Sequence, residues 1–476
     1  MSTNSNEPNG SMNSTTSSMH PRYAVFSEYF TQMRDTFAGE KVVKAKTTEY
    51  LPMTSGQRMD NVNGTDIYTD YLARSIYYDN VSDTVTDMLG LLHKEPTIFN
   101  LPSALGGMKT SATPEGESMA TLLRRIHEEQ LVPGRIGVLL DIPQGSRGAS
   151  VVPQFLTYNA ETILNWDIQN DTPRWFVLDE GGYELGDNLT WTWEKKYRMI
   201  ALDGNDDYYT FVYEDWPAGF DFDDPSATVE ATYPEISGKK LNGSLPFEVI
   251  NAASILPDFE YPPLLSVSNL SLAVYRGEAD YRQALFMQAQ ATMFLKGFQE
   301  EELANMRVGA GAAIKTSNDM AEASFIEVSG DGLEEMRQSQ ENLIEIVANL
   351  GVEMMDKTGV ESGDAIITRL TVRTASLSAI ADAAVAGLTK LLNISAEWVG
   401  ANPDEVEVIA AKDFSDSLVS AEDINDMWAV VLQGGMTLQD YHGWLAQNDF
   451  TNKTYELWLA ERDETIAEVA VPVTGL

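Results

Sequence analysis

The sequence predicts an α+β protein in which helical and strand-forming regions are largely separate. Three observations lead to this prediction. The texture is helical up to about residue 134, short β-branched and aromatic runs follow between 136 and 250, and long apolar-periodic segments flank a small strand-rich insert near residue 300. A chain of 476 residues also exceeds the roughly 250–300 residues at which a single core stops growing, so more than one structural region is expected.

The N-terminal region predicts a polar arm followed by helices. Residues 1–20 are rich in Ser, Thr and Asn and cannot bury enough apolar area to order themselves, so we expect a flexible arm. Val81, Val85 and Met88 recur at helical intervals before Gly90. A second helix is predicted over 118–130, closing at Pro133-Gly134.

The middle region predicts antiparallel strands separated by turns. The strand-like runs cover 136–143, 151–158, 174–180, 190–202 and 208–216. Alternation in the fourth run places Trp191 and Trp193 on one face of a half-buried sheet, and we interpret these aromatic residues as core. Carbohydrate stacking by Trp166, Trp191 or Trp216 is the alternative.

The C-terminal half predicts long helices. Pro262-Pro263 opens a helix that runs to about Thr292, because proline lacks only an N–H that has no partner in the first turn. Strand-like runs at 292–298, 309–316 and 323–330 follow, and a second helix begins near Leu333. This order predicts a two-helix stalk with a small β tip. The glycine-punctuated stretch 356–365 reads as a loop, a third long helix covers about 368–399, and shorter helical runs occupy the last segment.

The chain is strongly acidic. Asp and Glu number 72 against 32 Lys and Arg, which gives a formal net charge of −40. Its basic groupings are isolated pairs, at 124–125, 195–196 and 239–240, so tight nucleic-acid binding is disfavoured. Two interpretations remain open: an acidic surface that only keeps the protein soluble, or a surface along which DNA slides without sticking.

The sequence lacks the residues that several classes of functional site require. There is no cysteine, which excludes disulfides, thiolate metal sites and cysteine nucleophiles, and the four histidines are too far apart in sequence for an H-x₃-H zinc pair. No stretch approaches the ~18 apolar residues of a membrane span, and the first residues do not resemble a signal peptide. We therefore expect a soluble protein made in a cytoplasm, with no membrane partner.

No catalytic signature is present, so we expect no enzyme, cofactor or metal. Neither phosphate-binding glycine motif occurs, and the nearest match, GAGAA at 309–313, reads as a turn between strands. A G-x-S-x-G nucleophile elbow is absent. Acidic pairs such as Glu214-Asp215 and those in 221–224 arise by chance among 72 carboxylates, and a glycosidase would need two opposed across a cleft at about 5–10 Å.

Several motifs in the right order resemble the portal proteins of tailed bacteriophages, in the group often described as a domain of unknown function. The resemblance covers roughly residues 65–400. The motifs are Tyr71-Leu72-Ala73-Arg74, Tyr78-Asp79-Asn80, Thr84-Val85, Leu89-Gly90, Lys94-Glu95-Pro96, PGRIGVLLDIP (133–143), YNAETILNW (158–166), LPFEVI (245–250) and YPPLLSVSNLSLAVYRGEADYRQAL (261–285).

The resemblance implies a portal-type architecture: a mixed α/β wing, a two-helix stem, a small α/β clip, a tunnel loop, a long tunnel helix and a helical crown. The implied boundaries are 1–20 for the arm, 21–261 for the wing, 262–292 for stem helix 1, 293–331 for the clip, 332–355 for stem helix 2, 356–368 for the tunnel loop, 369–415 for the tunnel helix and wing return, and 416–476 for the crown.

The resemblance also implies a role and partners. Such a protein forms a homo-oligomeric ring, a dodecamer, at the portal vertex of the capsid in the virion, and contacts the major capsid protein, the large subunit of terminase and a head–tail adaptor. Double-stranded DNA passes through the ring without sequence specificity during packaging and ejection.

Six basic residues are candidates on this mapping. In the tunnel they are Lys357, Arg369 and Arg373; in the clip, where partners would bind, they are Lys296, Arg307 and Lys315. The alternative for the clip residues is three solvated surface cations. The alternative for Arg369 and Arg373 is pairing with Glu361, Asp364 or a neighbouring subunit.

Two other classes stay open. One is an acidic hydrolase with a carboxylate pair, which would be a monomer or small oligomer. The other is a tail or baseplate structural protein, which would lack the tunnel. A native mass separates the first from a portal, and imaging for a central channel separates the second.

Overall fold

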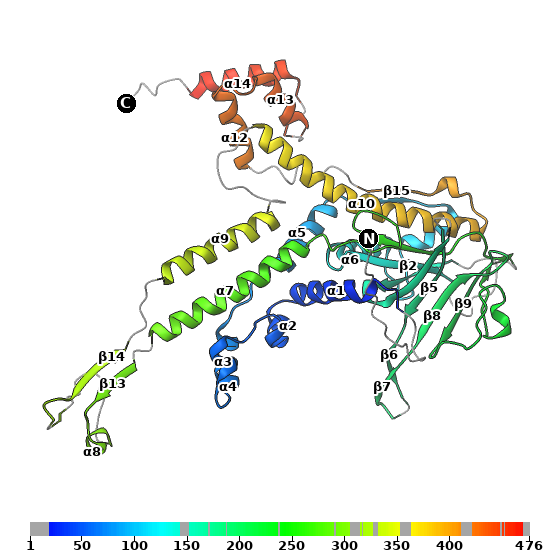
Figure 1. The fold of residues 1–476 in the computed structure, drawn as a ribbon. Helices are drawn as coiled ribbons and strands as arrows, with labels where there is room; N and C mark the ends of the chain where they lie inside the picture. Colours follow the sequence, from blue (N-terminus) through cyan, green and yellow to red (C-terminus); the bar gives the residue numbers. More distant parts are fainter. Residues whose placement is uncertain are drawn as a thin grey trace, which may run out of the picture. The chain divides into compact units, whose positions relative to one another are not determined.

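The chain forms an α+β fold in two compact units, described by a computed structural model (Figure 1). The described residues are 19–142, 152–169, 172–186, 188–236, 239–289, 292–304, 315–316, 318–326, 332–352, 363–410, 421–447, 450–451 and 453–469. The first unit comprises residues 1–34, 83–265 and 352–476, and the second comprises 35–82 and 266–351. The predicted arm, residues 1–20, lies almost entirely outside the described residues.

Antiparallel sheets form the centre of the first unit. A three-stranded sheet has the order β12-β2-β3 and a four-stranded sheet the order β4-β5-β8-β9, with the small pairs β1-β15, β6-β7 and β10-β11 beside them. The strands are β1 Ile98–Asn100, β2 Arg135–Asp141, β3 Gln154–Asn159, β4 Ile163–Gln169, β5 Thr172–Asp179, β6 Gly182–Leu185, β7 Trp191–Glu194, β8 Tyr197–Leu202, β9 Tyr208–Tyr213, β10 Glu235–Ile236, β11 Lys239–Lys240, β12 Phe247–Asn251 and β15 Glu407–Ile409.

Two helices, α6 Met119–Leu131 and α10 Gly363–Val399, pack on the three-stranded sheet. The first unit also contains α12 Ala421–Leu432, α13 Leu438–Gln447 and α14 Tyr455–Val469, while α1 Tyr23–Ala38 and α5 Asn80–Leu92 each continue from one unit into the other. The start of α6 follows from sequence, because the Ser118 hydroxyl caps the helix by accepting a hydrogen bond from the Thr121 N–H. Its exit at Gly134 needs a positive φ of 91°.

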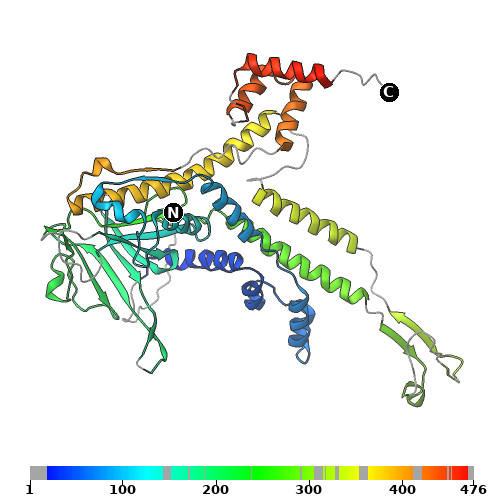
Figure 2. The same ribbon diagram turned by 180° about the vertical axis from the view of Figure 1, so that it is seen from behind.

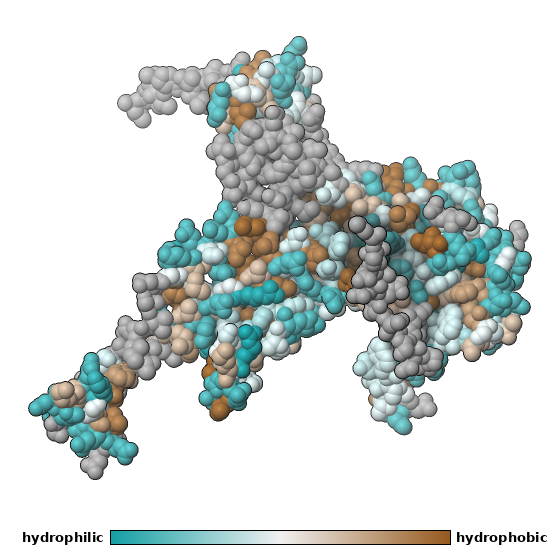
Figure 3. Space-filling view, viewed as in Figure 1, coloured by the Kyte–Doolittle hydropathy of each residue, from teal (hydrophilic) through white to brown (hydrophobic). Residues whose placement is uncertain are grey.

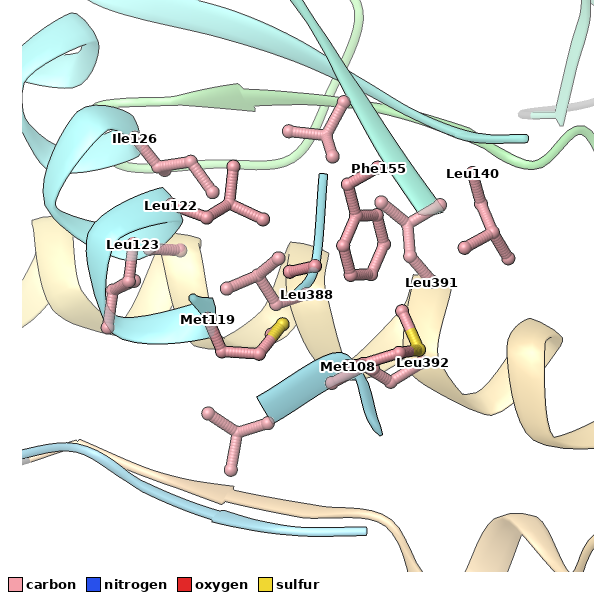
Figure 4. Packing of buried hydrophobic residues seen from close by; sticks show 14 of the residues in the cluster. Met108, Met119, Leu122, Leu123, Ile126, Leu140, Phe155, Leu388, Leu391 and Leu392 are labelled. Atoms are coloured by element: carbon pink, nitrogen blue, oxygen red, sulfur yellow. The ribbon is translucent and has the colours of Figure 1, made fainter. Parts of the chain in front are cut away.

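Strand β2 separates two cores. Its residues are buried on both faces, and Ile136, Val138 and Leu140 belong to the cluster under α6 and α10, whereas Leu139 faces the cluster shared with the four-stranded sheet. Helix α10 runs beside α6 and β12 in both ribbon views (Figures 1 and 2). In Figure 4, Leu388, Leu391 and Leu392 of α10 pack among side chains that include Met108 and Phe155.

The second unit contains two long helices joined through a small β-ribbon. Its elements are α2 Glu40–Ala45, α3 Ser55–Met59, α4 Gly64–Arg74, α7 Leu265–Ala289, β13 Thr292–Lys296, α8 Glu300–Ala304, β14 Glu322–Ile326 and α9 Leu333–Val352. Tyrosines from the 35–82 segment pack on α7 through Leu272, Tyr275 and Ala279. The predicted wing, 21–261, therefore does not form one compact body, because residues 35–82 join the helical unit.

The boundaries of the long helices differ from those expected. Helix α10 already begins at Gly363, so the second half of the predicted loop 356–368 is helical, and the expected start at 369 is wrong. Residues 353–362 lie outside the described residues. The two helices predicted as the stem are α7 over 265–289 and α9 over 333–352, and strand β13 starts at Thr292, a residue that the mapping assigned to stem helix 1.

One apolar segment also differs from expectation. Within the described residues, Ser376–Val399 of α10 is long and apolar enough to cross a membrane by composition alone, although the sequence analysis found no such stretch. More than half of this segment is buried in the first unit, and Leu377, Ile380 and Leu388 are core residues there. Packing inside the protein therefore accounts for its apolar character.

Candidate functional surfaces

The clip candidates lie in and beside a two-stranded antiparallel ribbon at the end of α7. Lys296 of β13 is directly opposite Glu322 of β14, and its Nζ lies 3.9 Å from a Glu322 carboxylate oxygen, with both side chains exposed. The turn after β13 is fixed by Gly297, whose φ is 77° and whose carbonyl accepts a 2.7 Å hydrogen bond from the Asn318 side chain. Lys296 is therefore a cross-strand partner as well as a surface cation.

The described part of this tip is acidic. Its described residues include two lysines, Lys296 and Lys315, against five acidic residues: Glu300, Glu301, Glu302, Asp319 and Glu322. Lys315 is exposed. Arg307 and the GAGAA turn at 309–313 lie outside the described residues. The surface therefore disfavours nucleic acid and suits a protein partner.

The two long helices of the second unit meet at a glycine. A Cβ atom at position 277 of α7 would overlap the side-chain amide of Gln340 in α9, so α7 and α9 approach closely here and a larger residue would require the Gln340 side chain to move. On α9, Arg337 pairs with Glu334 and Glu341, which raise the pKa of the arginine. This cation is engaged with acidic residues of its own helix.

Hydrogen bonds from residues 35–82 hold the second half of α7. The Tyr71 hydroxyl donates to Asp280 at 2.6 Å, and Arg74 donates to the Gln283 side chain at 2.8 Å. Burial is the main reason that the pKa of Tyr71 is raised. The sequence analysis did not predict this contact, although Tyr71 and Arg74 belong to the first motif of the family resemblance.

Helix α10 is anchored by its second half. Lys390 forms a 2.5 Å ion pair with Glu248 of β12, whose side chain is only 5% exposed. The Gln130 side-chain amide donates to the carbonyl oxygens of Asn251 at 2.7 Å and Ile380 at 3.1 Å, which ties α6, β12 and α10 together. These contacts hold the second half of α10 against the sheet.

The tunnel candidates fall on or before the first half of α10. Arg369 and Arg373 are four positions apart in the helix, so they occupy the same helical face. Asp364 is in the first turn of the same helix. Lys357 and Glu361 lie outside the described residues.

The tryptophans separate into buried and exposed groups. Trp166 is buried, with its ring stacked on His20 at 4.2 Å and the Arg135 guanidinium 5.2 Å from the ring centroid, so it offers no free face to a sugar. Trp191 and Trp193 are 64% and 61% exposed, which contradicts their interpretation as core. They belong to the β6-β7 pair, over which the described part of the chain places no second layer.

One of the two carboxylates that line a described cavity is engaged in hydrogen bonds. A cavity of about 220 Å³ is lined by Glu115, Arg125, Phe155, Leu156, Thr157, Tyr158 and Glu180. Glu180 accepts hydrogen bonds from Tyr158 at 2.7 Å and Arg198 at 2.6 Å. Asp215, beside Trp216, pairs with Lys195 at 3.2 Å. Among the described residues, no group of three or more His, Asp or Glu side chains could hold a metal ion.

Comparison with known proteins identifies one family model and several solved structures. The family described as "Domain of unknown function (DUF4055)" matches residues 263–399. No curated protein matches the chain. The matched family segment extends from the start of α7 to the end of α10.

The solved structures are similar at low identity. A chain from "Virion of native gene transfer agent (GTA) particle" has a TM-score of 0.38 and 13% identity over 81% of this chain and 94% of that chain. Chains from "Neck of empty GTA particle computed with C6 symmetry" and "Neck of native GTA particle computed with C12 symmetry" have TM-scores of 0.35 and 0.33, and identities of 14% and 12%. Both cover 77% of this chain and 89% of that chain.

Proposed function

We propose that this chain is the portal subunit of a tailed bacteriophage. The observation that carries the proposal is the order α7, β13-β14, α9 and α10: two long helices lead out to a small β-ribbon and back, and the chain then enters a long helix anchored on the β12 sheet. The resemblance to portal proteins implies the same order of stem, clip, stem and tunnel helix. On this proposal, β13-β14 with α8 is the clip and α10 the tunnel helix.

The charge distribution suits a conduit for DNA. Each lysine or arginine that contacts a phosphate adds about −0.9 to the slope of log affinity against log salt, so many cations in a channel would hold the DNA in place. Lys390 and Arg337 pair with acidic side chains of their own chain, and Lys296 faces Glu322. A sparse set of cations, with Lys357, Arg369 and Arg373 as candidates, leaves DNA free to slide.

The proposed partners follow from the same mapping. The ring is a homododecamer at the capsid vertex, surrounded by the major capsid protein, and the clip binds the large terminase subunit during packaging and the head–tail adaptor afterwards. Twelve copies at −40 each carry −480, so apolar interfaces must outweigh like-charge repulsion. Higher salt shortens the screening length, from roughly 30 Å at 0.01 M to 3 Å at 1 M, so moderate salt should favour the ring.

The DNA-handling role is tested in phage particles. We expect Lys357→Ala, Lys357→Glu and the double variant Arg369→Ala/Arg373→Ala to change the length or retention of packaged DNA. Lys94→Ala, at an exposed position beyond the end of α5, is the matched control and should package like the parent. If all the tunnel variants package and retain a full genome, the assignment of these three residues is wrong.

A further inference from the structure

The β6-β7 pair is an amphipathic ribbon, here called the aromatic ribbon (residues 182–186 and 188–194). Tyr183 is opposite Trp193, with ring centroids 5.1 Å apart, and Leu185 is opposite Trp191. Opposed residues share a face and successive residues alternate, so these four apolar side chains lie on one face. Glu184, Thr192 and Glu194 lie on the other face, so the ribbon has one apolar face and one polar face.

Among the residues that the structure describes, none covers the apolar face. Its four side chains are 50–66% exposed. Figure 1 shows β6 and β7 projecting beyond the four-stranded sheet, and Figure 3 colours this projection pale because Trp and Tyr have intermediate hydropathy. An isolated two-stranded hairpin is marginally stable in water, and a contiguous apolar surface of this kind marks a contact site.

The size of the apolar face indicates that it forms only part of a larger interface. Large aromatic side chains bury 150–250 Å² each, so four large residues exposed by about half to two thirds present on the order of 400 Å². A standard interface buries about 800 Å² on each partner. The aromatic ribbon is therefore too small to hold a partner alone, and fits a subunit that is also held elsewhere.

We propose that the aromatic ribbon packs against a neighbouring copy of this chain, a contact that rests on the proposed ring. Charge favours this occupant. A chain of net charge −40 can adhere to its own copy only where carboxylates stay out of the contact, and Glu184 and Glu194 lie on the opposite face of the ribbon. A partner that bound the ribbon through its own lysines or arginines would instead require Glu184 and Glu194 on the contact face.

The receiving surface is a second apolar patch of the first unit, here called the tyrosine patch (Val25, Tyr29 and Tyr261). Val25 and Tyr261 are 55% and 63% exposed, and the ring centroids of Tyr29 and Tyr261 are 5.5 Å apart. Arg22 at its edge is paired with Asp258, so this pair adds no net charge to the edge. A contact between two different surfaces of identical chains is heterologous and builds a ring when the rotation closes.

Hydroxyl-radical footprinting of the tryptophans tests whether a neighbouring copy of the chain covers the aromatic ribbon. The full-length protein is oxidised by hydroxyl radicals as assembled rings and as dissociated subunits, and Trp191 and Trp193 should react at least five-fold more slowly in rings. Equal rates in both forms, or protection that appears only with phosphatidylcholine vesicles or with purified major capsid protein, would overturn the self-contact. If no ring forms at any salt concentration, the proposed function itself fails, so the two failures are distinguishable.

Disulfide cross-linking tests whether the tyrosine patch contacts the aromatic ribbon of a neighbouring copy. The chain has no cysteine, so only the introduced cysteines can form the disulfide. Trp193→Cys protein is co-assembled with Tyr261→Cys protein and oxidised, and a disulfide between the two chains is expected. Thr192→Cys, on the polar face of the same strand, is the matched control and should give at least ten-fold less product. Equal yields from both pairs would remove the tyrosine patch as the receiving surface.

A double substitution measures the contribution of the ribbon to assembly. Trp191→Ser/Trp193→Ser should raise the protein concentration at which half the rings dissociate by ten-fold or more, whereas Glu184→Ser/Thr192→Ser on the polar face should leave it within two-fold of the parent. Because no residue of β6-β7 belongs to the hydrophobic clusters that the structure describes in the first unit, both variants should keep the melting temperature of the parent. Unchanged dissociation of the tryptophan variant would overturn the inference.

Discussion

Gly387 of α10 lies directly against Ile250 of β12. A Cβ atom at position 387 would come within 2.6 Å of the Ile250 Cγ1 atom, and Ile250 is fully buried. The absence of a side chain at this one position lets the helix approach the sheet closely. The ion pair between Lys390 and Glu248, one turn further along, holds the same contact.

Gly387→Ala should therefore destabilise the first unit even though alanine favours helices. The added methyl group overpacks a filled site, and we expect a loss of about 1–3 kcal/mol in the free energy of unfolding, measured by denaturant titration. Gly90→Ala in α5 is the control, because nothing lies within 4 Å of the added atom. That variant should lose nothing and gain up to about 1 kcal/mol. Equal effects at both positions would contradict the packing argument.

Lys390→Ala should destabilise the protein by leaving Glu248 buried without its cation. Because Lys390 itself is half exposed, water replaces part of the interaction, and we expect a loss of about 1–3 kcal/mol at neutral pH. Glu248→Gln in the same chain removes the buried charge and should restore at least half of that loss. A double variant as unstable as Lys390→Ala alone would show that the lysine acts by packing.

The cost of Lys390→Ala should depend on pH. Burial raises the pKa of Glu248 above its ordinary value of 4.5, while Lys390 opposes that rise. Without the lysine the carboxyl group is neutralised more readily on acidification. The difference in unfolding free energy between parent and variant should therefore shrink as the pH falls toward and below the pKa of Glu248. A difference that stays constant down to pH 4 would rule out this electrostatic origin.

His127 should make the protein less stable on mild acidification. Burial, with a smaller effect of His93, lowers the pKa of His127 to about 3 in the folded chain, against about 6.5 when unfolded. Between these values only the unfolded chain binds the proton, so stability falls as pH drops from about 6.5, by up to about 1.4 kcal/mol per pH unit. His127→Gln should flatten the slope between pH 6.5 and 5; an unchanged slope would refute the assignment.

Variants of the opposed pair Lys296 and Glu322 in β13-β14 can distinguish two effects. One is the position of the positive charge, and the other is the strength of the strand pairing. Lys296→Glu places two carboxylates opposite each other and should weaken the ribbon and the binding of the adaptor. The swap Lys296→Glu/Glu322→Lys restores an opposed pair with its polarity reversed. Adaptor affinity, measured by calorimetry, should stay reduced in the swap. Full recovery would mean that only the pairing matters, and not the place of the lysine.

The sequence predicted the elements whose signals are local. The helix predicted over 118–130 is α6, which ends before the Pro133-Gly134 stop, and Pro262-Pro263 lies just before α7. The expected loop 356–368 was too long because Gly363 was interpreted as a breaker, whereas it stands at the first position of α10. A glycine at a helix end costs little, so it does not exclude the helix.

Contacts between distant segments could not be predicted in this way. Alternation correctly placed Trp191 and Trp193 on one face but cannot say whether anything covers that face, and in the structure both side chains are exposed. Strand β4 was missed because it follows Ala160–Thr162 without a turn cluster and carries polar residues. The packing of residues 35–82 on α7 joins positions some 200 residues apart, and no local pattern encodes it.

The central claim is that this chain forms a ring through which DNA passes. The most direct measurement is a class-averaged top view of the purified full-length protein by electron microscopy, at a salt concentration that screens its charge. The proposal predicts a closed ring of about twelve copies with an open central channel. A monomer or small oligomer would favour the acidic hydrolase, and a large assembly without a channel would favour a tail or baseplate protein; either result would contradict the portal assignment.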